Sequence, residues 1–155
     1  MKIAIGSDHR GFEAKEQIKA IIHQLGYEGI DFGTTSNNPV DYPDVAYLVA
    51  MAVSKKQADK AILICGTGIG MCIAANKIKG IRAALCNDEL TAQISRHHND
   101  ANILCISGDM TGEVLLRKMV EVWLSTEFSG GRHKRRVQKI IAIEEGKDPG
   151  EVTNG

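Results

Sequence analysis

The sequence of 155 residues has no long hydrophobic run, no excess of either charge and few aromatic residues, which make up 5% of the chain. A membrane-spanning helix needs about 18 consecutive apolar residues, and no stretch reaches that length. Nineteen basic side chains balance nineteen acidic ones, which argues against a dedicated nucleic-acid binder or a basic membrane-surface protein. Residues 1–3 lead directly into a strand pattern, so we expect no signal peptide.

The four cysteines include no C-x-x-C pair, so the sequence contains neither a zinc knuckle nor a thioredoxin motif. In a chain without an export signal, they are expected to be reduced thiols of a cytoplasmic protein. The length suits one compact domain that can bury its own core.

Short apolar runs alternate with segments whose apolar residues recur at helical spacing. Strands are expected at 2–6, 29–32, 60–65, 81–86 and 102–106. Helices are expected at about 12–25, 44–56, 70–79, 88–97, 111–126 and 132–145. This alternation predicts an α/β fold, a three-layer α/β/α sandwich around a five-stranded parallel Rossmann-like sheet. The sequence does not predict the order of the strands in that sheet. Residues 1–145 are expected to form one domain, and residues 146–155 a mobile tail.

Ligands of open parallel sheets collect at the carboxyl ends of the strands, so polar residues beside the strands are candidates for a site. Asp8 and His9 follow the first strand. A histidine beside an aspartate can carry protons or contact a phosphate. The alternative, which has equal weight, is that Ser7 or Asp8 caps the following helix.

The third strand ends in Cys65 and runs into a glycine-rich loop, CGTGIG at 65–70. Alternating glycines before a helix expose N–H groups that can bind an anion, although such loops also serve only as tight turns. These donors favour a thiolate, so Cys65 is expected to be the reactive thiol. Cys86 also ends a strand but lacks the glycines, and Cys72 and Cys105 are interpreted as small core residues.

Two further polar segments lie near the last strand and the last helix. Residues 95–100 include His97 and His98, of which at most one is expected to face a pocket. A metal site there has little support, and a charge interaction with the helix end is the alternative. Arg132 and Arg136 share a helix face at a spacing that suits a phosphate clamp. A solvated basic surface is the alternative, and the patch is too short to favour nucleic acid.

Taken together, these segments resemble ribose-5-phosphate isomerase type B, within the sugar-phosphate isomerase family that also includes galactose-6-phosphate isomerase subunits. The resemblance runs in family order from residue 3 to about residue 145. The matching stretches are 6–9, 31–34, 41–43, 64–70, 74–77, 80–83, 95–96, 98–100 and 130–133.

The resemblance implies an aldose–ketose isomerase that works through an enediol(ate) without a metal or cofactor. Cys65 is then the base that moves a proton between C2 and C1, and His98 is the acid that helps to open the furanose ring. Another branch of the family places a glutamate directly after the glycine loop. This chain has Met71 there, so the base is expected to be Cys65.

The resemblance also implies the binding residues and the assembly. Asp8 and His9 contact the sugar, and Asn99 binds a hydroxyl. Arg132 and Arg136 bind the phosphate across the interface of a homodimer with shared active sites, or of a tetramer. No nucleic acid or membrane partner is implied. The N–H groups that hold the enediolate oxygen belong to Gly66, Thr67, Gly68, Ile69 and Gly70.

One position departs from the family pattern. Where isomerases of ribose 5-phosphate carry an arginine after the fifth strand, this chain has Asp109. A carboxylate there repels the phosphate by an amount comparable to the lost arginine contact, roughly 1–3 kcal/mol each. Three explanations stay open: Lys134 or Arg135 compensates, Asp109 turns away, or the substrate is a different sugar or a six-carbon sugar phosphate.

Two binding functions compete with the enzyme. Gly66, Gly68 and Gly70 resemble a dinucleotide-binding fingerprint, and Asp88 lies near the place of the ribose-binding acid. That fingerprint, however, needs its third glycine at the position of Met71 and follows a first strand, not a third. A sugar-phosphate-binding regulator without activity is the other alternative, supported only by Asp109.

Overall fold

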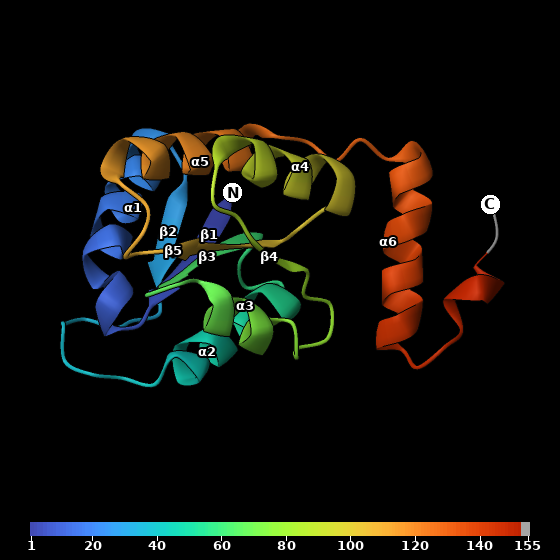
Figure 1. Cartoon of the computed structure of the whole chain (residues 1–155), viewed down its shortest axis with the longest axis horizontal. Coiled ribbons are helices and arrows are strands. Elements are labelled where there is room, and N and C mark those ends of the chain that lie inside the picture. The colour runs from blue at the N-terminus through green and yellow to red at the C-terminus, as the bar shows by residue number, and fades with distance from the viewer. Residues whose placement is uncertain (153–155) are drawn as a thin grey trace.

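A computed structural model describes residues 1–152 of the chain, which build one parallel β-sheet with helices on both faces (Figure 1). The strands are β1 (Lys2–Ser7), β2 (Glu28–Asp31), β3 (Lys60–Cys65), β4 (Ala83–Leu85) and β5 (Ile103–Ser107). The helices are α1 (Phe12–Gln24), α2 (Tyr42–Ser54), α3 (Ile69–Ala75), α4 (Glu89–Asn99), α5 (Glu113–Ser125) and α6 (Gly131–Glu144), with short 3-10 helices η1 (His9–Gly11) and η2 (Pro149–Glu151). None of the helices described within residues 1–152 is both long and apolar enough to cross a membrane.

Each face of the sheet builds its own core, because alternate residues of a strand point to opposite sides. On one face, Ile62 and Ile64 of β3 pack with residues of α1, α4 and α5. On the other face, Leu63 and Cys65 pack with residues of α2 and α3. The predicted three-layer sandwich is therefore confirmed, and the side chain of Cys65 is directed toward the α2 and α3 layer.

The strand order β2-β1-β3-β5-β4 fixes where a ligand crevice opens. From β1, the chain first adds β2 on one side of the strand and then adds β3 on the other. In sheets of this kind, ligands bind outside the carboxyl ends of the strands at the point where the crossovers diverge. That point lies between the ends of β1 and β3, beside Asp8 and Cys65.

Two predicted elements are shorter than expected, and the side chain of Asn76 explains both. The helix expected to reach residue 79 ends at Ala75, and β4 begins only at Ala83. The Asn76 amide donates to the carbonyls of Cys72 and Ala83 at 3.0 and 2.9 Å. Its oxygen accepts from the N–H of Ala83 at 2.9 Å. The side chain thus binds backbone groups at the end of the helix and at the start of the strand.

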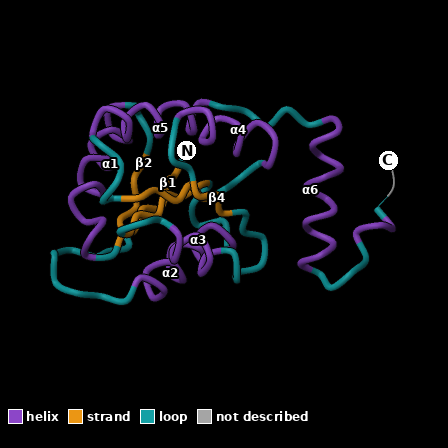
Figure 2. The backbone as a smooth tube through the Cα atoms, in the orientation of Figure 1, coloured by secondary structure: helices purple, strands orange, loops and turns teal. Residues whose placement is uncertain are grey.

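Helix α6 projects from the sandwich and lies beside η2 (Figures 1 and 2). Lys139 of α6 donates a hydrogen bond to the carbonyl of Pro149 at 2.8 Å. Ile140 and Ile143 are 44% and 61% exposed, although both are apolar. Residues 153–155 of the predicted mobile tail lie outside the described residues, and the mobility of the tail stays a prediction.

Candidate active site

A cavity of about 260 Å³ opens at the carboxyl ends of β1, β3 and β5. Among the residues expected in a site, Asp8, Cys65, Gly66, Thr67 and Gly70 line it together. Three further residues complete the lining. Asp109 is the residue that departs from the family pattern, and Arg10 and Tyr42 had no role assigned to them from the sequence.

The thiol of Cys65 lies at the base of this cavity and is held by the glycine-rich loop. The N–H of Gly68 donates to Sγ of Cys65 at 3.1 Å, so negative charge on the sulfur has a donor directed at it. Gly68 has a positive φ of 75°, which favours glycine. The loop also approaches the wall of the cavity closely, since a Cβ on Gly70 would lie 2.6 Å from the ring of Tyr42. The sequence signal for Tyr42 was its place in the matched stretch 41–43.

Asp8 caps η1, as one interpretation of the sequence predicted, and its position also leaves contact with a ligand open. Its Oδ1 accepts from the N–H groups of Arg10 and Gly11, each at 3.0 Å, and so caps η1. The same side chain lines the cavity and is only 6% exposed. His9 is differently placed, because its Nδ1 accepts from the N–H of Val40 at 3.3 Å. The ring of His9 therefore anchors the loop before α2 and does not line the cavity.

Asp109 pairs with Arg10 at the mouth of the cavity. Nη2 of Arg10 donates to Oδ2 of Asp109 at 2.5 Å, and the pKa of Arg10 is raised by that hydrogen bond and by the charge of Asp109. Asp109 does not turn away, because its carboxylate lines the cavity and pairs with Arg10. A signal for Arg10 was present in the sequence, because it directly follows Asp8 and His9 at a strand end.

His98 and Asn99 lie at the opposite side of the sheet from this cavity, near the amino ends of the strands. They end α4, which leads from β4 back to the amino end of β5. At that amino end, the N–H of Ala61 in β3 donates to the carbonyl of Asn102 at 2.9 Å, whereas Cys65 is the last residue of β3. Four residues of strand span about 13 Å. The expectation that segment 95–100 joins the strand-end residues is therefore corrected, because one chain does not bring His98 to Cys65.

His98 belongs to a group of histidines where α4 meets α6. The ring of His98 stacks on the ring of His133, with the two centroids 4.1 Å apart. The centroid of the His97 ring lies 5.2 Å from that of His98. Nε of Arg132 donates to Nε2 of His133 at 3.4 Å. Burial, followed by the neighbouring His98 and Arg132, lowers the pKa of His133. The stacked rings fix the start of α6 against the end of α4.

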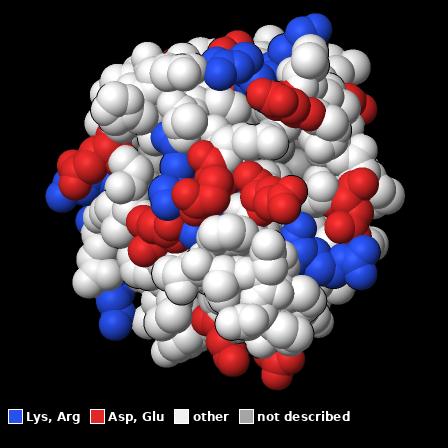
Figure 3. Space-filling model, turned by 90° about the vertical axis from the view of Figure 1, so that its left-hand side faces the viewer, with Lys and Arg blue, Asp and Glu red and all other residues white. Residues whose placement is uncertain are grey.

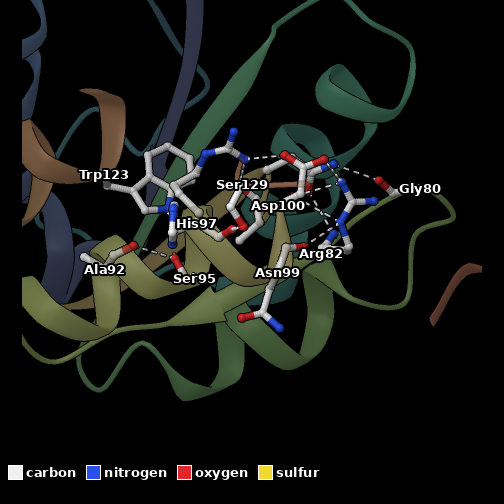
Figure 4. A network of polar contacts seen from close by, with 12 residues as sticks. Gly80, Arg82, Ala92, Ser95, His97, Asn99, Asp100, Trp123 and Ser129 are labelled. Carbon is white, nitrogen blue, oxygen red and sulfur yellow. Dashed lines mark hydrogen bonds and ion pairs between the residues drawn. The ribbon is translucent and has the colours of Figure 1, made fainter. Parts of the chain in front are cut away.

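Asn99 ends α4 beside a polar network centred on Arg82 (Figure 4). Arg82 donates to the carbonyl of Asn99 at 3.1 Å and to the Asp100 carboxylate at 2.9 Å. The side chain of Asn99 points away from these contacts. With Arg82 and Ile140, it lines a second cavity of about 290 Å³ between the sheet and α6.

The residues expected in one site thus form two groups on one chain. Asp8, Cys65 and the glycine loop lie at the carboxyl ends of the strands. The second group consists of His98 and Asn99 at the end of α4 and of Arg132 and Arg136 in α6, the helix on the right in Figure 1. Both arginines are exposed and four residues apart on α6, as a clamp requires.

The remaining cysteines do not share the surroundings of Cys65. Cys86 and Cys105 are buried, and burial raises the pKa of both. Cys72 is only half-buried, and a hydrogen bond with Cys105 is the main cause that lowers its pKa to about 7. Cys72 is thus a residue at the margin of the core rather than within it.

Two competing site types receive no support from the geometry. Asp88, the candidate ribose-binding acid of a nucleotide site, caps α4 by accepting from the N–H of Thr91 at 2.7 Å. Within residues 1–152, no three side chains of His, Cys, Asp or Glu lie close enough together to hold a metal ion.

Comparison with known proteins agrees with the fold and with the matched motifs. The family model described as Ribose/Galactose Isomerase matches residues 3–140. Ribose-5-phosphate isomerase B of Escherichia coli is 48% identical over 144 residues, which cover 93% of this chain and 97% of that protein. D-erythrulose-4-phosphate isomerase of Pectobacterium atrosepticum is 41% identical and covers 90% and 93%.

A solved structure extends this similarity to three dimensions. That of ribose-5-phosphate isomerase B from Clostridium thermocellum superposes with a TM-score of 0.93 at 51% identity, covering 94% of this chain and 99% of that one. The family model alone spans most of the described residues, including the cavity and most of α6. The chain therefore belongs to the ribose/galactose isomerase family.

Proposed function

We propose that the protein is an aldose–ketose isomerase that interconverts ribose 5-phosphate and ribulose 5-phosphate, with Cys65 as the base. One observation carries the proposal: the sulfur of Cys65 lies in the cavity at the end of β3 and accepts a hydrogen bond from the glycine loop at 3.1 Å. Removing a proton beside a carbonyl needs a base within reach of the substrate and donors for the developing oxyanion. The thiol and the loop supply these two requirements side by side.

In the proposed reaction, the thiolate of Cys65 removes the proton from C2 of the open-chain aldose. The electron pair of that C–H bond forms the C1–C2 double bond, and the carbonyl electrons move to O1, which gives an enediolate. The N–H groups of residues 66–70 stabilise its oxygen. The sulfur then returns the proton to C1, and the O2 proton passes to O1, which completes the ketose. No metal is required for any of these proton transfers.

We further propose that each active site is shared between two chains of a homodimer. The support is topological, because His98 and Asn99 lie at the amino edge of the sheet and Cys65 at the carboxyl edge. A second copy can bring its own His98, Arg132 and Arg136 to the first cavity. The exposed isoleucines of α6 are the kind of apolar surface that a second chain covers.

A different sugar phosphate is the second candidate substrate, because Asp109 lines the cavity. The relative named D-erythrulose-4-phosphate isomerase, at 41% identity, supports considering a shorter sugar as well as a six-carbon one. The proposed base and loop act on C1 and C2, so they are compatible with any of these chain lengths.

A thiol base must stay reduced, which suits the cytoplasm.

The test is to incubate the purified protein with ribose 5-phosphate in EDTA and to follow ketose formation, with four-carbon and six-carbon aldose phosphates in parallel. We expect turnover in the chelator, with the highest kcat/KM for ribose 5-phosphate. A higher kcat/KM for another sugar phosphate would make that sugar the substrate in place of ribose 5-phosphate. Activity that requires added metal would contradict the proposed mechanism. Binding without turnover of any sugar phosphate would favour a regulator.

A further inference from the structure

An ion pair between two strand ends crosses the mouth of the cavity. Arg10 follows β1, and Asp109 follows β5, 99 residues later. Both side chains line the cavity that contains Cys65. The Arg10 side chain is 61% exposed and that of Asp109 is 35% exposed, so an entering ligand can reach the pair.

The pair lies directly over the first glycine of the loop. A Cβ on Gly66 would lie 2.9 Å from Nε of Arg10 and 2.9 Å from Oδ2 of Asp109. Real Cβ atoms do not approach other atoms so closely, so a side chain at position 66 would displace the pair from this position. The guanidinium is therefore next to the residue that follows the proposed base.

Backbone contacts fix Asp109 relative to the same loop. The N–H of Asp109 donates to the carbonyl of Gly66 at 3.2 Å, and that of Gly108 donates to the carbonyl of Cys65 at 2.8 Å. The hydroxyl of Ser107 donates to the Gly66 carbonyl at 2.6 Å. Asp109 is thus a rigid acceptor that orients Arg10, whose own N–H is already bound by the Asp8 cap.

The charges around the cavity leave Arg10 as the cation for an anionic ligand. Among the described residues that line the cavity, the charged ones are two carboxylates, Asp8 and Asp109, and one cation, Arg10. Acidic and basic side chains are interspersed on this side of the molecule, with acidic ones near the middle of the view (Figure 3). A guanidinium has five N–H donors, and the bond to Asp109 engages one of its nitrogens.

We propose that Arg10 is this chain's own contact for the phosphate of the substrate and that Asp109 is its positioning residue. The arginine that the family resemblance implies after the fifth strand is then replaced by an arginine after the first strand, held in place by an aspartate. This inference rests on the proposed isomerase function, because it assigns the phosphate end of that substrate. It also removes the conflict that Asp109 posed, since the carboxylate is neutralised before the phosphate arrives.

The test compares Arg10→Ala, Arg10→Lys and a control, Arg117→Ala, with the wild type. Arg117 is a partly exposed arginine of α5 paired with Glu121, away from the cavity. We expect Arg10→Ala to raise KM for ribose 5-phosphate about tenfold to a hundredfold with kcat changed less than threefold, the loss of one charged phosphate contact. Arg10→Lys should recover part of the loss, and Arg117→Ala should match the wild type. An unchanged KM in Arg10→Ala would overturn the assignment.

Binding of 5-phosphoribonate, an open-chain acid that cannot isomerise, separates this inference from the proposed function. Titration calorimetry should show a Kd for Arg10→Ala at least tenfold weaker than for the wild type, whether or not the wild type turns over ribose 5-phosphate. An active wild type with equal Kd values would refute the role of Arg10 alone. An inactive wild type with unequal values would refute the isomerase function alone.

The role of Asp109 is tested by a double-mutant cycle. Asp109→Ala should raise KM severalfold in the wild-type background and have no such effect in the Arg10→Ala background, because its action passes through Arg10. Equal effects in both backgrounds would show that Asp109 acts independently and would overturn its positioning role.

Discussion

The N–H of Gly68 and the sulfur of Cys65 are joined by a hydrogen bond of 3.1 Å. Gly68 adopts a positive φ of 75°, so that the chain turns into α3 directly after the residue whose N–H is bound to the sulfur. A residue with a side chain would adopt this conformation only with strain. The loop glycine thus acts on the chemistry of the thiol through the backbone.

Replacing this glycine should therefore impair both the fold and the activity. A Cβ on Gly68 would lie 2.6 Å from Cδ1 of Leu85 and 2.9 Å from the carbonyl carbon of Ile106, so the loop has to shift. For Gly68→Ala we expect a loss of stability above about 1 kcal/mol in urea unfolding and at least a tenfold loss of kcat. Gly112→Ala is the matched control, because Gly112 has a negative φ and no atom within 4 Å of an added Cβ. Wild-type kcat in Gly68→Ala would refute the role of the loop.

Subunit mixing tests the shared site. Cys65→Ala and His98→Asn homodimers should each be nearly inactive. In a heterodimer of the two, one site combines the intact Cys65 of one chain with the intact His98 of the other. With random exchange, half of the dimers are mixed and one of their two sites works, so we expect about a quarter of wild-type activity.

Native mass spectrometry of the mixture confirms the exchange of chains. Each variant carried through the same exchange with itself is the control and should remain inactive. If mixed dimers form and activity does not return, the two residues do not meet across the interface.

The ion pair between the buried Lys15 and the more exposed Asp31 predicts a specific acid sensitivity. Burial by itself raises the pKa of Asp31, but hydrogen bonds from Lys15, Lys19 and the N–H of Gly33 outweigh it, so that the pKa is lowered below 3.8. A carboxyl with a lowered pKa in the folded state stabilises the fold above its unfolded pKa. That stabilisation is lost as the pH falls through the folded pKa.

Asp31→Asn should therefore lower the free energy of unfolding at pH 7, and it should lower it by less near pH 2.5. The Lys15 side chain is only 1% exposed and lies 2.6 Å from Asp31, but Asp31 is partly exposed and Glu16 also pairs with Lys15 at 3.3 Å. We therefore expect a loss of about 1–2 kcal/mol at pH 7. Urea unfolding at the two pH values measures it. Asp41→Asn is the control, because the Asp41 side chain makes no cap hydrogen bond. A loss that is the same at both pH values would contradict the account.

Much of the fold follows from local sequence patterns. Buried strands such as 60–65 are continuous apolar runs, and their positions depend on little else. The order of the strands depends on contacts between distant segments, so no local pattern contains it. Asn76 shortens α3 and β4 through side-chain bonds to the backbone, which the periodicity of the apolar residues does not reveal.

The site was predictable where its residues adjoin a strand end in sequence. Asp8 and Cys65 come together because parallel strands end at one edge. The pairing of Arg10 with Asp109 joins positions 99 residues apart, and only the fold reveals it. The placement of His98 could have been predicted from the sequence, because a helix that precedes a parallel strand ends near the amino ends of the strands.

The most direct test of the account is kcat for ribose 5-phosphate in Cys65→Ala, measured beside Cys72→Ala as a matched cysteine control. If Cys65 is the base, kcat falls by about 10²–10⁴-fold, while Cys72→Ala keeps wild-type activity and both variants unfold like the wild type. A folded Cys65→Ala variant with kcat within threefold of the wild type would contradict the central claim.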